Sequence, residues 1–352
     1  MPYDEALVHR ILDEARQCVM AELELVLERN RRTGFGALHD LIADYPFREG
    51  KGLRPAICLA ACLAAGGRTD QARLAASALE LFHNAFLVHD DVEDGSEFRR
   101  GTVTMLRSHG VPSAVNVGDA TNVLAMQLLL DNTATIGLRK ALLVLREVER
   151  MARESVEGQA IELHWIANGC FQLDDSDYLR MAYKKTCWYT VIAPLRIGVI
   201  CGRPAGVRTL LTEELVPLIE LGYLAGIAFQ ICDDVLNLEG DEAVYGKEVN
   251  GDLWEGKRTV MLLHFLRTTT SSKRARALRL LRTPRASKRA EEISWLRNAM
   301  EKAGSIAYGR TLSREFAARA AETDSRLSGL FEDNDERRFL SEMLNYVVER
   351  PK

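Results

Sequence analysis

The stretch LELFHNAFLVHDDVED, residues 79–94, decides the fold of this chain and much of its chemistry. Its apolar side chains recur every three or four positions, which predicts a helix with one face in the protein core. The helix ends in the acidic cluster Asp90-Asp91-Val92-Glu93-Asp94. In a helix, Asp90 and Asp94 lie one turn apart on the same face. Carboxylates at the end of an apolar helix cost desolvation energy unless cations contact them.

A second stretch of the same kind, LAGIAFQICDDVLN, follows at residues 224–237, about 140 residues further along the chain. Here Asp233 and Asn237 share one helical face, and Asp234 lies beside them. Two such faces turned toward each other would hold hard, oxygen-preferring cations such as Mg²⁺. The pair of clusters therefore suggests metal-bridged diphosphate chemistry.

Composition narrows the class of protein. The chain has 352 residues, 47% of them hydrophobic and only 9 of them proline, which favours a well-packed, helix-rich globule. A net charge of -4 argues against a general polyanion binder, so we expect no nucleic-acid partner. The seven cysteines form no CxxC pair, and the N-terminus is unlike a signal peptide. No uncharged run approaches the roughly 18–20 apolar residues that span a bilayer. We expect a cytoplasmic protein without a membrane anchor.

Helical periodicity runs through nearly the whole chain, and no stretch shows strand-like alternation. We expect one all-α domain spanning residues 1–352, with short connections as in a helical bundle. The expected helices cover about 4–31, 55–65, 71–92, 113–131, 137–168, 175–201, 212–239, 257–268 and 290–304, with more to about 349. Residues 271–290 hold eight Lys or Arg and no acids; a solvated surface helix is favoured there over an RNA- or membrane-binding strip.

Basic groups accompany both acidic clusters in glycine-containing segments. Lys51 and Arg54 belong to GKGLRP, where Pro55 suits the first helical position and the backbone N–H groups of a helix start favour anions. The pair Arg99-Arg100 follows the first cluster and can grip phosphate oxygens in a bidentate manner. Segments with Lys247 and Lys257 follow the second cluster. Together these groups describe a site for two diphosphates.

Five ordered motifs, between about residues 45 and 260, carry a family resemblance: GKGLRP, HDDVEDGSEFRRGTVT, KKT, FQICDDVLN and YGKEVNGDLWEGKRT. In this order they resemble those of trans-isoprenyl diphosphate synthases, the polyprenyl synthetases. The resemblance implies the isoprenoid synthase fold, a helical bundle around a deep central cavity, and a homodimer. It also implies head-to-tail condensation of isopentenyl diphosphate with an allylic diphosphate whose ionisation is assisted by Mg²⁺, expected as three ions per site.

The resemblance also implies a role for each matching residue. The metal ligands would be Asp90, Asp94 and Asp233, with Asp91, Asp234 and Asn237 in support. The allylic diphosphate would be bound by Arg99, Lys185, Lys247 and Lys257, and isopentenyl diphosphate by Lys51, Arg54, His83 and Arg100. His83 alone would more often be a core histidine, but it lies seven residues before Asp90 on the same helical face. Thr186 and Gln230 match the positions whose oxygens face the carbocation, a task that suits neutral dipoles.

The chain departs from the family pattern at two positions. One change removes the charge of a side chain, and the other lengthens a side chain. Asn237 stands where Asp is more usual, so it keeps an oxygen ligand and loses a negative charge. Glu162, three residues after Gln159 of a Gly-Gln pair that resembles a cavity-lining motif, stands where Asp is common. We expect activity despite the change at Asn237.

Product length is predicted from the helix before Asp90. One turn rises about 5.4 Å, close to one isoprene unit, so side chains one, two and three turns back can act as a ruler. These are Phe86, Phe82 and Leu79. Short-chain members often have an aromatic residue five positions before the motif, where this chain has Ala85. We therefore favour geranylgeranyl diphosphate (C20) over farnesyl diphosphate (C15) as the product. The alternative to the ruler is that both phenylalanines only pack the core.

Two other functions remain open from the sequence. A class I terpene cyclase shares the first aspartate motif, but its second metal motif is usually an Asn/Ser/Glu triad, which DDVLN does not resemble. A non-catalytic subunit of a heteromeric synthase typically loses an aspartate cluster, and here both clusters are largely intact. Condensation is the favoured reaction.

Overall fold

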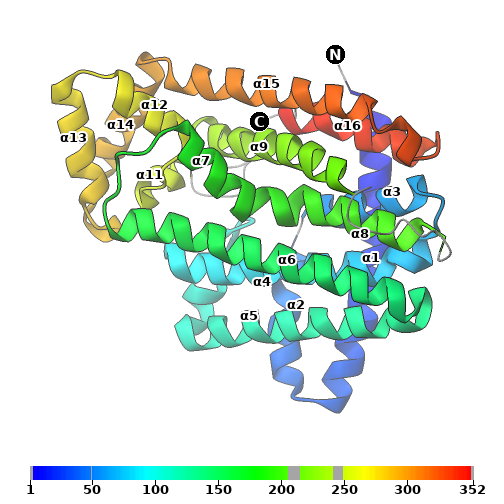
Figure 1. The fold of residues 1–352 in the computed structure, drawn as a ribbon. Helices are drawn as coiled ribbons and strands as arrows, with labels where there is room; N and C mark the ends of the chain where they lie inside the picture. Colours follow the sequence, from blue (N-terminus) through cyan, green and yellow to red (C-terminus); the bar gives the residue numbers. More distant parts are fainter. Residues whose placement is uncertain (1–2, 49, 205–214, 241–248, 350–352) are drawn as a thin grey trace.

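Helices make up almost all of the regular structure in the computed structural model, which describes residues 3–48, 50–204, 215–240 and 249–349 (Figure 1). The predicted all-α fold is confirmed. The first half of the chain forms α1 (Glu5–Thr33), α2 (Gly36–Phe47), α3 (Leu53–Ala64), α4 (Thr69–Asp94), β1 (Phe98–Arg99), β2 (Thr102–Val103), α5 (Met105–Asp131) and α6 (Thr133–Ala167). The second half forms α7 (Asp175–Ala182), η1 (Tyr183–Ile192), α8 (Ala193–Gly202), α9 (Val216–Glu239), α11 (Gly251–Glu255), α12 (Val260–Thr268), α13 (Ser271–Arg282), η2 (Arg285–Ser287), α14 (Ala290–Lys302), α15 (Ser305–Ser325), η3 (Ser328–Leu330) and α16 (Asp335–Glu349).

The two helices that carry the acidic clusters lie inside the bundle. In Figure 1, α9 crosses the middle of the molecule, with α15 above it and α6 below it. Helix α9 packs against α15 and η1, and α4 packs against α5 and α3. Helices α11 to α14 form one end of the molecule, at the left of Figure 1. The clusters are thus built on rigid, packed elements rather than on loops.

Helix α8 approaches α3 so closely that only glycine fits at two of its positions. A Cβ added to Gly198 would lie 2.3 Å from the carbonyl oxygen of Cys58. A Cβ added to Gly202 would lie 2.2 Å from the carbonyl oxygen of Cys62. Alanine at either position would force the helices apart, because interiors are packed to near crystal density.

The helix expected at 175–201 is continuous but not uniform, because its middle is the π-helix η1. Isolated π-helical segments are rare and often mark functional sites. Opposite η1, a Cβ added to Gly158 of α6 would lie 2.2 Å from the backbone nitrogen of Lys185. Gly158 therefore allows η1 to lie directly against α6, which brings Lys185 and Thr186 into the interior.

The expectation that the chain has no strands was wrong for one short segment. Strands β1 and β2 form an antiparallel hairpin in which Phe98 pairs with Val103. Its two turn residues, Arg100 and Gly101, have φ values of 53° and 71°. Positive φ at both positions is the type I′ geometry that suits the twist of two-residue hairpins. The hairpin places Arg99 in a strand and Arg100 in the turn.

Other differences from the predicted helices are local. Helix α2 was not expected; α11 lies in a segment expected to be a break; and α3 begins at Leu53, so Pro55 is its third residue rather than its first. The prediction that no segment is apolar enough to span a membrane also needs correction. Helix α9 has the length and a mean hydropathy of 1.3 that pass such a test, but half of that stretch is buried within the protein. It is a core helix that carries the second acidic cluster.

Candidate active site

A cavity of about 590 Å³ opens between α3, α4, the hairpin, η1, α9 and α11. It brings together most of the residues singled out in the sequence. The predicted site residues that line it are Lys51, Arg54, His83, Asp90, Asp94, Arg99, Arg100, Lys185, Thr186, Gln230, Asp233, Asp234, Asn237 and Lys257. Lys247 lies outside the described residues. The two acidic clusters, distant in sequence, thus share one cavity.

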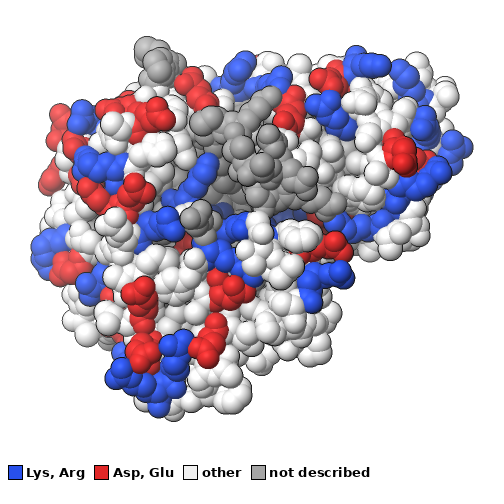
Figure 2. Space-filling view, turned by 180° about the vertical axis from the view of Figure 1, so that it is seen from behind, with Lys and Arg blue, Asp and Glu red and all other residues white. Residues whose placement is uncertain are grey.

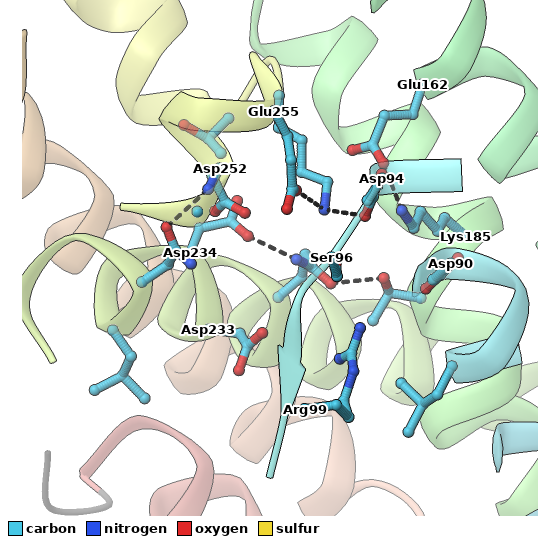
Figure 3. A pocket seen from close by; sticks show the side chains of 18 of the residues that line it. Asp90, Asp94, Ser96, Arg99, Glu162, Lys185, Asp233, Asp234, Asp252 and Glu255 are labelled. Carbon is cyan, nitrogen blue, oxygen red and sulfur yellow. Dashed lines mark hydrogen bonds and ion pairs between the residues drawn. The ribbon is translucent and has the colours of Figure 1, made fainter. Parts of the chain in front are cut away.

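Figure 3 shows the carboxylates of α4 and α9 from within this cavity, with Asp90 and Asp94 on one side and Asp233 and Asp234 on the other. Burial, together with the nearby Asp94, raises the pKa of Asp90 to about 6. The pKa of Asp94 is instead lowered, because Lys257 and Lys185 outweigh the effect of its burial. Burial and the neighbouring Asp233 raise the pKa of Asp234 to about 7. Without added cations, one carboxylate of each cluster, Asp90 and Asp234, thus carries an electrostatic cost.

The middle aspartate of each cluster is anchored by a buried tyrosine. The Oη of Tyr45 donates a 2.6 Å hydrogen bond to Oδ2 of Asp91, and Arg99 pairs with Oδ1 of the same carboxylate. The Oη of Tyr178 donates a 2.8 Å hydrogen bond to Oδ2 of Asp234. Asp91 is fully buried and does not line the cavity.

Sequence reasoning missed both tyrosines. Tyr45 stands in a segment for which no helix was expected, and Tyr178 stands in an expected helix that looks ordinary. They reach their aspartates across 46 and 56 residues of sequence. The one available signal was general: a Tyr hydroxyl that becomes buried usually has a hydrogen-bond partner. Nothing in the local pattern identifies that partner.

Thr186 and Gln230 form a short hydrogen-bonded chain that leads to the second cluster. The Oγ1 of Thr186 donates to Oε1 of Gln230 at 2.6 Å, and Nε2 of Gln230 donates to Oδ1 of Asp234 at 2.6 Å. Both side chains line the cavity. The chain fixes the orientation of the Gln230 amide, so its dipole is set before any ligand enters.

The cations on the acidic side of the cavity are paired with carboxylates. Lys185 lies 2.5 Å from Glu162, the residue that departs from the family pattern. Lys257 lies 2.8 Å from Asp94 and 2.6 Å from Glu255. Although burial disfavours a charged lysine, Glu162 and Asp90 hold the pKa of Lys185 above its usual value. Asp94 and Glu255 likewise raise the pKa of Lys257 despite its burial, so both lysines are protonated. Each ammonium has three donors, so a bound anion can join the carboxylates as a partner or replace them.

Four basic groups outside the acidic clusters also line the cavity, and the hairpin supplies one of them. Arg100 donates to the carbonyl oxygens of Tyr45 and Arg48 at 3.1 and 3.2 Å. Arg54 donates to Oγ1 of Thr190 at 3.0 Å. Burial and the cations Arg99, Arg54 and Arg48 lower the pKa of Arg100, which is the expected effect of crowded like charges. With Lys51 and His83, these groups form a basic pocket.

Tyr189 of η1 connects this basic pocket with the predicted chain-length residues, and sequence reasoning missed it. Its ring lies 4.4 Å from the guanidinium carbon of Arg54 and stacks on His83 at a centroid distance of 5.9 Å. Phe86 meets the same ring edge-on at 5.6 Å. Tyr189 lines the cavity, whereas Phe82, Ala85, Phe86 and Leu79 do not. Of the predicted ruler residues, Phe86 contacts Tyr189, and Phe82 contacts Phe86 with ring centroids 6.5 Å apart.

The side chain of Asn237 binds the backbone of α11 in this structure. Its Oδ1 accepts a 3.1 Å hydrogen bond from the backbone N–H of Asp252, at the start of α11. Asp252 itself lines the cavity, and burial followed by nearby acids, Asp234 among them, raises its pKa well above the usual range. Asn237 lacks the negative charge of an aspartate, but the carboxylate of Asp252 on α11 belongs to the same cavity.

The donor set fits hard divalent cations, because oxygen ligands from carboxylates are those that Mg²⁺ and Ca²⁺ prefer. Among the described residues, however, no three acidic, histidine or cysteine side chains converge closely enough to hold an ion by themselves. The elevated pKa values of Asp90 and Asp234 agree with carboxylates that lack enough positive charge around them. This arrangement suits ions that are completed by ligand oxygens, as Mg²⁺ commonly is beside phosphates.

Comparison with known proteins identifies the family. Residues 37–300 match the model of the polyprenyl synthetase family. A short chain isoprenyl diphosphate synthase of Methanothermobacter thermautotrophicus is 30% identical over 301 residues, which cover 86% of each chain. The crystal structure of geranylgeranyl pyrophosphate synthetase from Pyrococcus horikoshii superimposes with a TM-score of 0.82 at 28% identity, covering 99% of each chain. A polyprenyl synthase from Caulobacter crescentus, complexed with calcium and isoprenyl diphosphate, has a TM-score of 0.82 at 26% identity, covering 97% of this chain and 98% of that one.

These similarities extend over the whole cavity as well as the surrounding helices. The matched region contains both acidic clusters, η1 and the basic pocket. The predicted resemblance and the predicted enzyme class, a trans-prenyltransferase, are therefore confirmed. The chain belongs to the polyprenyl synthetase family.

Proposed function

We propose that this protein condenses isopentenyl diphosphate head-to-tail with an allylic diphosphate and that its main product is geranylgeranyl diphosphate. The observation that carries the proposal is that one cavity is lined both by carboxylates of the two acidic clusters and by the basic groups Lys51, Arg54, His83 and Arg100. Figure 3 shows Asp90 and Asp94 across the cavity from Asp233 and Asp234. We assign the carboxylates and the basic groups to two ends of the cavity, because two diphosphates need such a division when only one of them binds through metal.

At the acidic end, Asp90, Asp94 and Asp233 would hold Mg²⁺, with three ions expected per site. When bound, the metal supplies Lewis-acid stabilisation of the charge that develops on the departing diphosphate. Lys185 and Lys257 would bind the same diphosphate by exchanging Glu162 and Glu255 for phosphate oxygens. Arg99 is held against Asp91 and lines the cavity, so its position is set before substrate enters. Lys247 is included in this set by its motif alone.

At the basic end, Lys51, Arg54, His83 and Arg100 would bind isopentenyl diphosphate without metal. Tyr189 supports two of them through its ring. Cations on aromatic faces remain free to donate hydrogen bonds outward from the ring. The two diphosphate sites line a common cavity, which holds the reacting carbons near each other and lowers the entropic barrier to condensation.

The carbocation formed from the allylic group would lie near Thr186 and Gln230. Their oxygens are neutral dipoles fixed by the chain to Asp234. Such dipoles stabilise positive charge without acting as strong nucleophiles. The released diphosphate is the proton acceptor that we propose for the final step, so no protein base is assigned.

The C20 product is proposed over C15 because Ala85 offers no aromatic stop at its position. Phe86 contacts Tyr189 and Phe82 contacts Phe86, and both rings would limit longer chains. Geranylgeranyl diphosphate is also the product named for the similar Pyrococcus horikoshii enzyme.

A homodimer is proposed from the surface of α5 and α6. Val123 and Leu130 of α5 and Leu138 of α6 are 70%, 60% and 65% exposed. Met126 and Leu142 extend this apolar surface along the same two helices. Exposed apolar side chains gathered on neighbouring elements usually mark a protein interface. We place the enzyme in the cytoplasm, in agreement with its seven free cysteines, and we expect no nucleic-acid partner.

Incubation of the pure protein with isopentenyl diphosphate, Mg²⁺ and each of dimethylallyl, geranyl and farnesyl diphosphate tests the proposal. Dephosphorylated products are then sized by mass spectrometry. The expected result is geranylgeraniol, lost on addition of a chelator and restored by Mg²⁺. A cyclic hydrocarbon from one prenyl diphosphate alone would identify a cyclase, and full turnover in the presence of chelator would refute the metal-assisted mechanism.

A further inference from the structure

The basic segment 271–290 turns back toward the catalytic cavity after α13. Lys288 is only 8% exposed, and its Nζ donates to the carbonyl oxygens of Leu253 and Trp254 at 3.0 and 2.5 Å. These carbonyls belong to the short helix α11, whose C-terminal end carries partial negative charge. A buried ammonium requires such partners, because its desolvation would otherwise be prohibitive. Lys288 therefore ties the segment to α11.

Arg285 makes a second connection to the same helix through its side chain. Its Nη1 lies 3.3 Å from Oε1 of Glu255, whose other oxygen lies 2.6 Å from Nζ of Lys257. Lys257 in turn lies 2.8 Å from Asp94. Alternating charges thus run in a line from Arg285 to the first acidic cluster. Figure 3 shows Glu255 and Asp94 at the cavity end of this line.

Neighbouring side chains also hold the backbone turn between Glu255 and Lys257. Gly256 has a φ of 80°, a conformation that favours glycine, and a Cβ there would lie 3.6 Å from Nζ of Lys288. On the other side of this turn, Arg258 donates to the carbonyl oxygens of Cys170 and Trp165 at 3.0 and 2.9 Å. The turn that presents Lys257 to the cavity is therefore clamped from both sides.

Several other cations of the segment are also engaged within the chain. The guanidinium of Arg276 lies 3.8 Å from the ring centroid of Trp295, and that of Arg282 lies 5.6 Å from that of Phe171. Arg274 donates to the carbonyl oxygen of Arg267 at 3.1 Å. Blue side chains line the right-hand edge of Figure 2, the side on which α13 lies, but red ones are interspersed. These contacts favour an internal role for the segment over the docking of a polyanion.

We propose that Lys288 and Arg285 are positioning residues that hold the turn at Gly256 so that Lys257 can bind the diphosphate of the allylic substrate. Neither residue lines the cavity, so both act through Lys257 and Glu255. Arg285 also keeps a cation beside Glu255 when Lys257 exchanges that carboxylate for phosphate. This inference rests on the proposed role of Lys257.

The decisive variant is Lys288→Met, which keeps the length of the side chain and removes its donors. We expect the KM for farnesyl diphosphate to rise about tenfold, the scale of one lost charge-assisted hydrogen bond, with the KM for isopentenyl diphosphate unchanged. Lys288→Arg should restore most of the loss. Lys273→Met, an exposed lysine of the same segment, is the matched control and should behave as wild type. If Lys288→Met does not fold, Arg285→Gln carries the same comparison.

A double-mutant cycle distinguishes positioning from general destabilisation. If Lys288 acts through Lys257, Lys257→Ala combined with Lys288→Met should be no worse than Lys257→Ala alone. Additive effects, an equal rise in both KM values, or no change in Lys288→Met would overturn the inference. An unaltered KM for farnesyl diphosphate in Lys257→Ala would instead overturn the proposed role of Lys257, and the inference with it.

The pH dependence supplies a readout that a purely structural role would not produce. Burial, followed by the neighbouring cations Arg258 and Arg285, lowers the pKa of Lys288 to about 8, with Glu255 opposing them. Lys288 therefore loses its charge as the pH rises through about 8. The KM of the wild type for farnesyl diphosphate should rise above this pH, whereas that of Lys288→Arg should not, because arginine stays protonated. Parallel profiles for the two proteins would contradict the proposal.

Discussion

The Oη of Tyr178 lies 2.8 Å from Oδ2 of Asp234, so a buried phenol fixes one carboxylate of the second acidic cluster. Hydrogen bonds from Tyr178 and Gln230 lower the pKa of Asp234, while burial raises it, and the outcome is a value of about 7. The protonation state of this carboxylate near neutral pH thus depends on a residue 56 positions away in the sequence.

Tyr178→Phe should shift the acidic limb of the pH–activity profile to higher pH. Loss of the phenol removes one interaction that favours the carboxylate, so the pKa of Asp234 rises and ionisation needs a higher pH. The free energy of unfolding should fall by about 1–3 kcal/mol, since a buried hydrogen bond to a charged group is lost. Rate profiles and urea unfolding measure the two effects. Tyr183→Phe in the adjacent π-helix is the control, and an equal shift there would count against the interpretation.

Asn237→Asp should destabilise the metal-free protein. The new carboxylate can still accept from the N–H of Asp252, but it adds negative charge beside Asp252, Asp233 and Asp234. We expect a loss of roughly 1–2 kcal/mol, recovered when Mg²⁺ and inorganic diphosphate are added. Thermal unfolding with and without these ligands measures it. Asn237→Ala, which loses the hydrogen bond to α11, should be destabilised in both conditions; stability unaffected by either change would refute the assigned role.

Phe86→Ala should lengthen the product beyond C20. Phe86 backs Tyr189 at 5.6 Å, and removing its ring leaves space behind the cavity wall. The ring centroid of Phe82 lies 6.5 Å from that of Phe86, and Phe86 is the ring that contacts Tyr189, so Phe82→Ala should lengthen the product less or only in combination. Ala85→Phe is the opposite test and should shorten the product toward C15. Mass spectrometry of dephosphorylated products gives the result, and unchanged lengths in Phe86→Ala and Phe82→Ala would remove the ruler argument.

Leu130→Glu or Val123→Glu should convert a dimer into a monomer. Either change places a charge within the exposed apolar surface of α5, where burial against a second copy would be costly. Sedimentation should show the wild type at twice the mass of the 39.4 kDa chain and the variants at one such mass. Val216→Glu, at the exposed start of α9, should leave the mass unchanged. A monomeric wild type would refute the proposed assembly.

The sequence by itself determined the fold class, most helix positions and fourteen of the residues that line the cavity. Apolar periodicity is a local property, so it predicted α4 and α9 from their own residues. The acidic clusters were recognisable because carboxylates at the end of an apolar helix cost desolvation energy unless cations contact them. The motifs also predicted that Lys51, Lys185 and Lys257 share one site, and all three line the cavity.

Only the tertiary structure decided which partners these residues have. Tyr45 and Tyr178 anchor Asp91 and Asp234 from distant helices, and Arg285 reaches Glu255 across 30 residues. The π-helix at Lys185 depends on Gly158 of α6, which leaves room for its backbone. Such contacts depend on how the helices pack, and packing depends on all residues of the core together. Periodicity and motifs, in contrast, are properties of one segment of the chain.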